Sequence, residues 1–151
     1  MTKMRLWMMI CEADISPQIQ WARRCRYSGD TVVWIDVAKL DASWRHDREF
    51  YITPGGGGAS IRGRYERFGE WLEQGHAIEM PEVGINTHYD RLVFVNGRHR
   101  FAWLRDHGVT SLPVCVSKEQ AKIIRQRFGN ASLKTLGEAV ASRWIIDKGH
   151  G

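Results

Sequence analysis

The residues best suited to chemistry in this 151-residue chain stand together in the run Phe94-Val95-Asn96-Gly97-Arg98-His99-Arg100. An apolar, strand-like stretch precedes Gly97 and a helical pattern follows it, so the glycine marks a strand-to-helix junction. Backbone N–H groups at such a junction bind anions, and the helix dipole strengthens the attraction. Arginine binds phosphate through two parallel hydrogen bonds. We therefore predict a phosphate site at Gly97, Arg98, His99 and Arg100; in the alternative interpretation the arginines only form surface ion pairs.

A glycine-rich segment at 54–58 is the second candidate for phosphate binding. The run 58–65 comes close to the GxxxxGK[ST] pattern of phosphate-binding loops. It departs from that pattern at the two decisive places, because Arg64 replaces the lysine and Tyr65 replaces the hydroxyl residue that holds magnesium. Two interpretations stay open: a flexible glycine loop that cradles phosphate or closes over a ligand, and a plain connector.

The histidines and carboxylates give weaker indications. The six histidines show neither HExxH nor paired-cysteine spacing, so the sequence leaves the metal undetermined. His88 with Asp90 could at most hold a divalent ion loosely. Glu66, in the arginine-bearing helical stretch, and Glu82, just after Pro81, are candidates for acid–base chemistry, but no paired-carboxylate geometry follows from their spacing.

The three cysteines form no CxxC pair, and an odd number cannot all be bonded within one chain. We expect a reducing compartment, the cytoplasm, and a buried thiol at Cys115 because it lies in an apolar stretch. The apolar run at 6–11 is too short for a membrane span and is interpreted as a first strand.

Several elements must position these residues. Loose alternation over 20–27, a turn at 28–30 and β-branched residues over 31–37 predict a hairpin. The apolar spacing of Ile61, Tyr65, Phe68 and Leu72 predicts a helix that ends before Gly75.

The second half of the chain predicts a compact β–α–β unit. Its strands are expected at 91–95 and 112–116, parallel or close in one sheet, with a helix over 98–107 between them. Two more helices are predicted over 118–128 and 133–146. The expected fold is therefore α+β with α/β-like character: one small mixed sheet and three to four helices.

The composition agrees with one globular domain. Hydrophobic residues make up 43% of the chain and charged residues 26%, which excludes a disordered protein. The formal net charge of +5 favours phosphate, nucleic acid or an acidic surface as the partner.

Several blocks resemble known families. The blocks 96–108 and 112–116 are similar to the nucleotide-binding motif of the ParB/sulfiredoxin superfamily. Together with 36–41, 54–58, 64–72 and 80–83, they resemble the plasmid fertility inhibition factors, including the oncogenic-suppression type, which block conjugative DNA transfer. The resemblance covers about 32–128.

This resemblance implies a single ParB/sulfiredoxin-like domain over 1–151, with a helical extension over 117–151. It implies ATP as the nucleotide, DNA as a partner, hydrolysis of one or both (an ATPase and DNase), and Mg²⁺ to neutralise phosphate charge. A component of the type IV secretion coupling apparatus or of the relaxosome is the implied protein partner. The implied phosphate-binding residues are Gly97, Arg98, Arg100, Gly56, Gly57, Gly58, Ser60, Arg64 and Arg67, and the implied catalytic residues are His99, Glu66 and Glu82.

The chain departs from two relatives within the superfamily. Sulfiredoxins carry a cysteine where Arg98 stands, so sulfinic-acid reduction is not expected. Too little chain follows Val116 for the helix-turn-helix domain of the chromosome-segregating ParB proteins.

Two alternatives differ in class from the enzyme. One is a non-enzymatic protein that blocks a secretion component, with Trp21, Trp44 and Trp144 as anchors. The other is a ParB-like DNA-binding protein, which is disfavoured because no recognition-helix motif is visible.

Overall fold

The protein is described by a computed structural model that covers residues 19–22 and 24–130. The described part contains a four-stranded sheet and four helices, which confirms the α+β class. The strands are β1 (Thr31–Asp36), β2 (Glu82–Asn86), β3 (Arg91–Asn96) and β4 (Ser111–Val116). The helices are α2 (Val37–Trp44), α3 (Arg64–Glu73), α4 (Arg98–Asp106) and α5 (Lys118–Phe128).

The strands follow the order β1-β4-β2-β3. β1 and β4 are antiparallel, β2 and β3 form an antiparallel hairpin, and β2 meets β4 in parallel where Glu82 faces Cys115. Of the two predicted alternatives, strands that lie close in one sheet are confirmed and strands that run parallel are not. β3 and β4 run in opposite directions because β2, which lies between them, is parallel to β4 and antiparallel to β3. β2 gives no strand signal in the sequence, because glycine, asparagine and glutamate interrupt its apolar pattern.

The predicted hairpin over 20–37 is also wrong. β1 pairs with β4 along its whole length, and Trp21 instead forms an isolated bridge with Ile78. The chain turns into α2 at Val37 because the side chain of Asp36 accepts a hydrogen bond from the Lys39 N–H at 3.0 Å and caps the helix. All six residues of β4 are buried, so this central strand needs a partner on both edges, and β1 supplies one.

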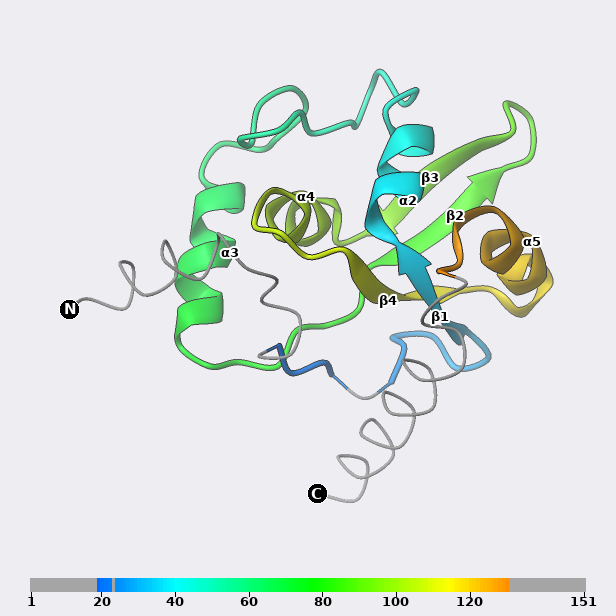
Figure 1. Cartoon of the computed structure of the whole chain (residues 1–151), viewed down its shortest axis with the longest axis horizontal. Coiled ribbons are helices and arrows are strands. Elements are labelled where there is room, and N and C mark those ends of the chain that lie inside the picture. Colours follow the sequence, from blue (N-terminus) through cyan, green and yellow to red (C-terminus); the bar gives the residue numbers. More distant parts are fainter. Residues whose placement is uncertain (1–18, 23, 131–151) are drawn as a thin grey trace.

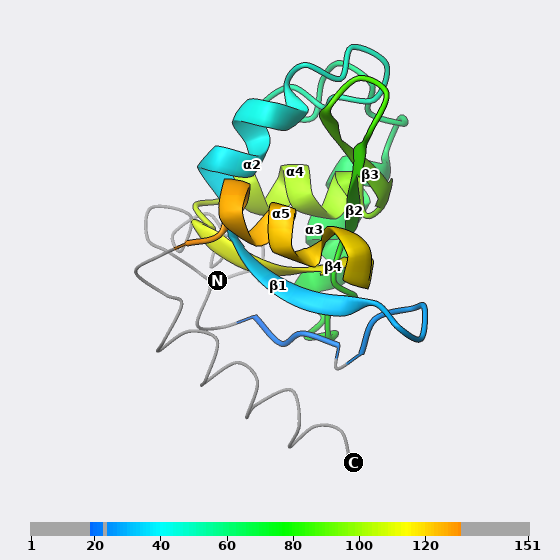
Figure 2. The same ribbon diagram turned by 90° about the vertical axis from the view of Figure 1, so that its right-hand side faces the viewer.

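Two of the helices, α2 and α5, pack directly on the sheet, whereas α3 packs on another helix (Figures 1 and 2). α5 packs against β1, β2 and β4, and α2 packs against β3 and α5. α3 packs on α4, which lies between α3 and the strands in Figure 1. The helices predicted over 98–107 and 118–128 are thereby confirmed, whereas the expected strand at 6–11 and helix over 133–146 lie outside the described residues.

The core is rich in aromatic side chains. The Trp44 ring lies 4.6 Å from Phe94 and 5.7 Å from Phe101, centroid to centroid, and Trp44 and Phe101 are fully buried. Trp21 is also buried, at 5% exposure. Trp21 and Trp44 therefore cannot be the surface anchors that the non-enzymatic alternative requires, and Trp144 lies outside the described residues.

A buried polar network holds the long connection between α2 and α3 in place. The Asp106 carboxylate accepts hydrogen bonds from the Gly55 N–H at 2.9 Å, the Tyr65 hydroxyl at 2.8 Å and the Arg105 Nε at 2.8 Å. Arg105 also binds Asp41 on α2 at 2.9 Å. Burial raises the pKa of Asp106, but the three hydrogen bonds and the charge of Arg105 outweigh burial and hold that pKa below its ordinary value. The glycine-rich segment is thus fastened to the end of α4.

The cysteine interpretation needs one correction. Cys115 is buried as expected, but it forms a disulfide with Cys25 and is not a free thiol. The bond joins residues 90 positions apart, a pairing that sequence spacing does not reveal. Cys11 lies outside the described residues. Among the described helices, none is both long and apolar enough to cross a membrane.

Candidate functional site

The strand-to-helix junction predicted at Gly97 exists, and only glycine fits there. Gly97 has φ = 87° and precedes α4, whose first turn carries no side-chain cap. A Cβ at this position would lie 2.6 Å from Arg100 Nη2 and 3.0 Å from the Pro81 Cα. The guanidinium of Arg100 therefore lies against Gly97, in the space that a Cβ would occupy.

α3 begins in the same way. Gly63 has φ = 83°, and a Cβ there would meet Arg67 Nη1 at 2.9 Å. Both helices thus start with a left-handed glycine covered by an arginine three or four residues further on. In the sequence each glycine is followed by an arginine within four residues, and this pattern acquires a function only because both helix starts line one cavity.

Parts of the two arginines at the start of α4 are buried without a partner among the described residues. These atoms are Arg98 Nε and Arg100 Nε and Nη2. Burial lowers the pKa of Arg98, and the positive charge of Arg64 lowers it further. Burial also lowers the pKa of Arg100, against the opposing effect of Glu79 and Glu82. Buried polar groups are normally hydrogen-bonded, so unpartnered guanidinium N–H groups are suited to receive an anion.

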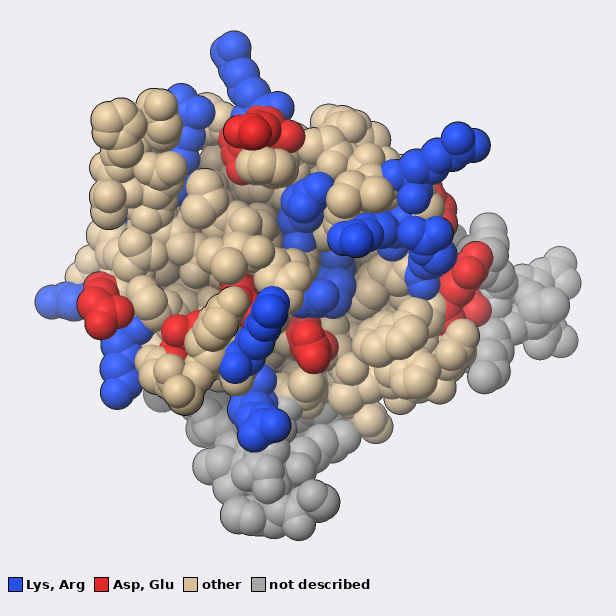
Figure 3. Space-filling view, turned by 180° about the vertical axis from the view of Figure 1, so that it is seen from behind, with Lys and Arg blue, Asp and Glu red and all other residues tan. Residues whose placement is uncertain are grey.

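These arginines line a cavity of about 590 Å³ between α3 and the start of α4. A volume of this size suits a small-molecule ligand. Figure 3 shows basic side chains gathered around a hollow on this face, with carboxylates just below them. The lining residues from α3 are Arg64, Arg67, Phe68 and Trp71; those from the end of β3 and the start of α4 are Phe94, Val95, Asn96, Gly97, Arg98, His99 and Arg100; Ala77 and Glu79 complete the wall.

Trp71 differs from the other aromatic residues of these two helices. An aromatic side chain on a helix usually packs inward, as Phe68, Phe101 and Trp103 do. Trp71, however, is 37% exposed and its ring stacks on His76 at 4.7 Å. It gives the arginine-lined cavity a flat aromatic wall.

His99 has a clear local role in the structure. Its Nε2 atom accepts a hydrogen bond from the Ile61 N–H at 2.9 Å and so connects α4 to the segment before α3. Burial, together with the charges of Arg98, Arg64 and Arg100, lowers the pKa of His99 to about 4, although Glu66 opposes this shift. At neutral pH the imidazole is therefore uncharged, as an acceptor at Nε2 requires.

The remaining predicted site residues are spread around this centre. Gly56, Gly57, Gly58 and Ser60 do not line the cavity; a Cβ on Gly56 would meet the Tyr65 ring at 2.7 Å, so at this point the glycine segment packs on that ring. Glu66 lies on α3 near His99. The phosphate contacts predicted for the glycine segment stay predictions.

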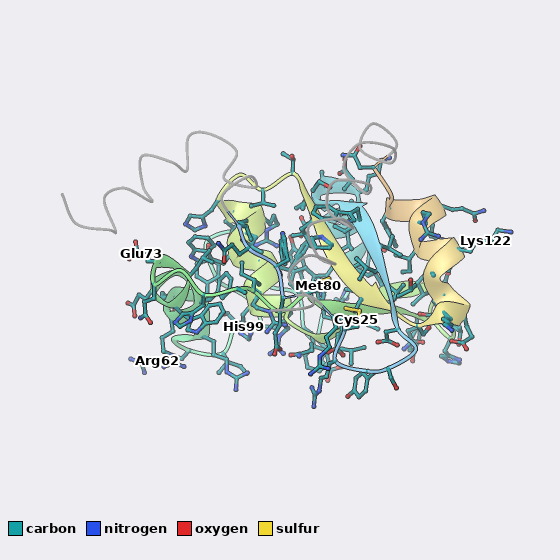
Figure 4. All side chains as sticks on the ribbon, turned by 90° about the horizontal axis from the view of Figure 1, so that it is seen from below. Cys25, Arg62, Glu73, Met80, His99 and Lys122 are labelled. Atoms are coloured by element: carbon teal, nitrogen blue, oxygen red, sulfur yellow. A yellow bond between two sulfur atoms is a disulfide. The ribbon has the colours of Figure 1, made fainter. Side chains whose placement is uncertain are left out.

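Glu82 is the first residue of β2 and does not line the arginine-lined cavity. It is 4% exposed, its Oε2 atom has no partner among the described residues, and with Glu79 and Cys25 it lines a separate cavity of about 770 Å³. Figure 4 shows the Cys25 sulfur bond close to Met80 at this place, with His99 on the side toward Arg62. Glu79 lines both cavities.

Within the described residues, no group of three or more histidine, cysteine or acidic side chains is arranged to hold a metal ion. Asp90, considered above with His88, instead forms an ion pair with Arg127 at 3.0 Å.

Comparisons with known proteins give two matches. A family model described as plasmid fertility inhibition factor matches residues 32–129. A crystal structure of the Oncogenic Suppression Activity Protein, a plasmid fertility inhibition factor in its gold(I) cyanide derivative, matches with a TM-score of 0.53 at 15% sequence identity. The match covers 70% of this chain and 60% of that one, and at this identity it shows the fold alone. No curated protein sequence matches the chain.

Proposed function

Because the chain belongs to the plasmid fertility inhibition factor family, which implies inhibition of conjugative transfer, we propose that it acts by binding a nucleotide in the cavity at the start of α4. The buried, unpartnered guanidinium atoms of Arg98 and Arg100 carry the proposal. They flank the N–H end of a helix, where a phosphate would satisfy both the cations and the backbone. Arg64 and Arg67 reach the same cavity from α3.

ATP is the nucleotide that we propose. Its phosphates suit the four arginines, and its base suits the aromatic wall formed by Phe68 and Trp71. Glu79 is the carboxylate in the lining and is the residue best placed to hold Mg²⁺, which protein sites often bind through one or two carboxylates plus substrate phosphates. When bound, this ion would neutralise phosphate charge.

We further propose that the same cavity supports hydrolysis of the nucleotide and cleavage of DNA. The arginines would stabilise negative charge that develops on a reacting phosphate. The Nε2 atom of His99 is engaged with the Ile61 N–H, so it can accept a proton only when that hydrogen bond opens. Glu66→Gln and Glu82→Gln distinguish the carboxylate candidates, because only loss of the acid–base group should stop hydrolysis while nucleotide binding persists.

We place this activity in the cytoplasm, where ATP and DNA awaiting transfer are both found, although a disulfide such as Cys25–Cys115 rarely persists in a reducing compartment. A component of the secretion apparatus or relaxosome would bring the protein to that DNA. Blocking of transfer by a variant with a dead cavity would instead support inhibition through binding alone.

The decisive experiment measures ATP affinity by calorimetry. Arg98→Ala and Arg100→Ala should each weaken binding by about 10- to 150-fold, the equivalent of about 1.5–3 kcal/mol for a hydrogen bond to a charged group. Arg62→Ala is the matched control, because Arg62 is exposed, does not line the cavity and lies at the periphery in Figure 4. ATP affinity equal to wild type in both cavity variants would refute the assignment.

A further inference from the structure

A second basic cavity lies outside the nucleotide site, between the end of α2 and the tip of the β2–β3 hairpin. We call it the hairpin cleft; its volume is about 680 Å³. Figure 3 shows basic side chains near the hairpin tip at the upper left, apart from the larger group over α3 and α4. The cleft is lined by Ser43, Arg45, His46, Arg48, Tyr89, Asp90 and Arg91.

The hairpin cleft carries an excess of positive charge. Its three arginines face one acidic residue of the lining, Asp90, and that carboxylate is already paired with Arg127 of α5 at 3.0 Å. Arg91 donates to the His46 carbonyl at 3.2 Å, which ties the hairpin to the end of α2. Arg45 is 67% exposed, although its guanidinium lies 3.5 Å from Asp41 and also interacts with Tyr51. The charge is therefore available to a polyanion from solvent.

Exposed aromatic rings accompany this charge. Tyr89 is 62% exposed, and the Arg91 Cζ lies 5.3 Å from its ring centroid. An accessible ring beside an arginine is the arrangement that binds single-stranded nucleic acid, since unpaired bases stack on the ring and the cation meets the phosphate. Duplex DNA hides its base faces and gains nothing from such a ring.

Phe50 links the hairpin cleft to the nucleotide cavity along the chain, although the two cavities share no lining residue. Phe50 is 45% exposed, and its ring lies 5.4 Å from the Cζ of Arg98, a cavity residue. Arg48 of the cleft is two residues before Phe50, a span of at most about 7 Å along the chain. Two negative charges lie on this route: Glu49, which is exposed between them, and Asp47, whose carboxylate acts on Arg98.

We propose that the hairpin cleft is a second subsite that binds the backbone and bases of a single DNA strand whose reacting nucleotide occupies the cavity at α4 in place of ATP. This inference rests on the proposed function, because it extends the DNA path from that cavity over Phe50 to Tyr89. The ligand class is a single-stranded polynucleotide, recognised by arginine–phosphate contacts and base stacking and without sequence preference.

The first test removes the charge of the cleft. Binding of a labelled oligo(dT) of about 20 nucleotides, long enough to span both sites, is measured by fluorescence anisotropy over a range of salt concentrations. In Arg45→Gln/Arg48→Gln the slope of log affinity against log salt should fall by about 1.4, since each contact with a single strand contributes about 0.7. Lys118→Gln/Lys122→Gln removes the same charge from exposed positions on α5, where Lys122 points away from the body in Figure 4, and should leave more of the slope intact.

The second test removes the stacking ring. Tyr89→Ala should weaken oligo(dT) binding at least about fivefold, the equivalent of the lower limit of about 1 kcal/mol for one stacked base. Tyr89→Phe keeps the ring and should bind as wild type. Because Tyr89 is exposed, both variants should fold normally, and circular dichroism checks this.

The outcomes separate the two proposals. ATP affinity should be unchanged in the cleft variants. Loss of ATP affinity in Arg98→Ala therefore tests the nucleotide site, and the salt slope of oligo(dT) binding tests the cleft. Equal slopes in the cleft variant and the α5 control would overturn the inference. Tyr89→Ala binding that equals wild type, together with displacement of the DNA by poly-glutamate, would also overturn it and identify a surface for acidic proteins.

Discussion

The Asp106 carboxylate accepts hydrogen bonds from three groups that position the glycine-rich segment, α3 and Arg105, so its replacement tests this support directly. Asp106→Asn removes the charge that faces Arg105, whose side chain is 9% exposed, while Asp106 itself is 13% exposed. The Gly55 N–H and the Tyr65 hydroxyl bond the same carboxylate. We expect the free energy of unfolding at pH 7 to fall by about 3 kcal/mol. This is the lower end of the range for breaking a buried ion pair, because Arg105 retains its second ion pair, with Asp41.

Urea unfolding followed by tryptophan fluorescence measures this loss. With an m value of about 2 kcal/mol/M, the midpoint should drop by about 1.5 M. The matched control is Asp90→Asn, which breaks a pair of similar length, 3.0 Å, whose side chains are 70% and 38% exposed. It should cost at most about 1 kcal/mol, and asparagine tolerates the positive φ of 52° at this position.

The pH dependence gives an independent check. The pKa of Asp106 lies below its ordinary value of 3.8, so its stabilisation is fully present above that value and is lost as the pH falls through the lowered pKa. Wild type and Asp106→Asn should therefore converge in strong acid. A loss below about 0.5 kcal/mol at pH 7, the size expected of an ordinary surface substitution, or a gap that does not narrow in acid, would refute this account of the network.

Two further predictions concern the disulfide and His99. Cys25→Ser should lower the free energy of unfolding by about 2–5 kcal/mol, and dithiothreitol should bring wild type to the same value while leaving the variant unchanged; a wild type insensitive to the reductant would contradict the bond to Cys115. Because the pKa of His99 is lowered from 6.5 to about 4, the unfolded chain takes up its proton first, and wild type should lose stability as the pH falls from 6.5 to 4. His99→Gln should show a flatter profile over this interval in urea unfolding; an unchanged slope would mean that the imidazole is not held neutral by its surroundings.

The sequence by itself determined the elements whose signals are local. The turn at Gly97, the helix that follows it and the helix at Lys118–Phe128 depend on glycine, capping and apolar spacing within a few neighbouring residues. The arginine cluster at this turn likewise indicates phosphate binding from residue types and spacing alone. The family resemblance, based on ordered blocks of residues, was also confirmed.

Only the tertiary structure decided which residues meet. Strand pairing joins distant segments, so the sequence showed neither β2 as the partner of β4 nor the bond between Cys25 and Cys115. A guanidinium becomes an anion site when its N–H groups are buried without partners, and that condition at Arg98 and Arg100 is created by elements packed around them. The hairpin cleft exists for the same reason: α2 and the β2–β3 hairpin are separated in sequence, and only the folded sheet brings their arginines and Tyr89 to one surface.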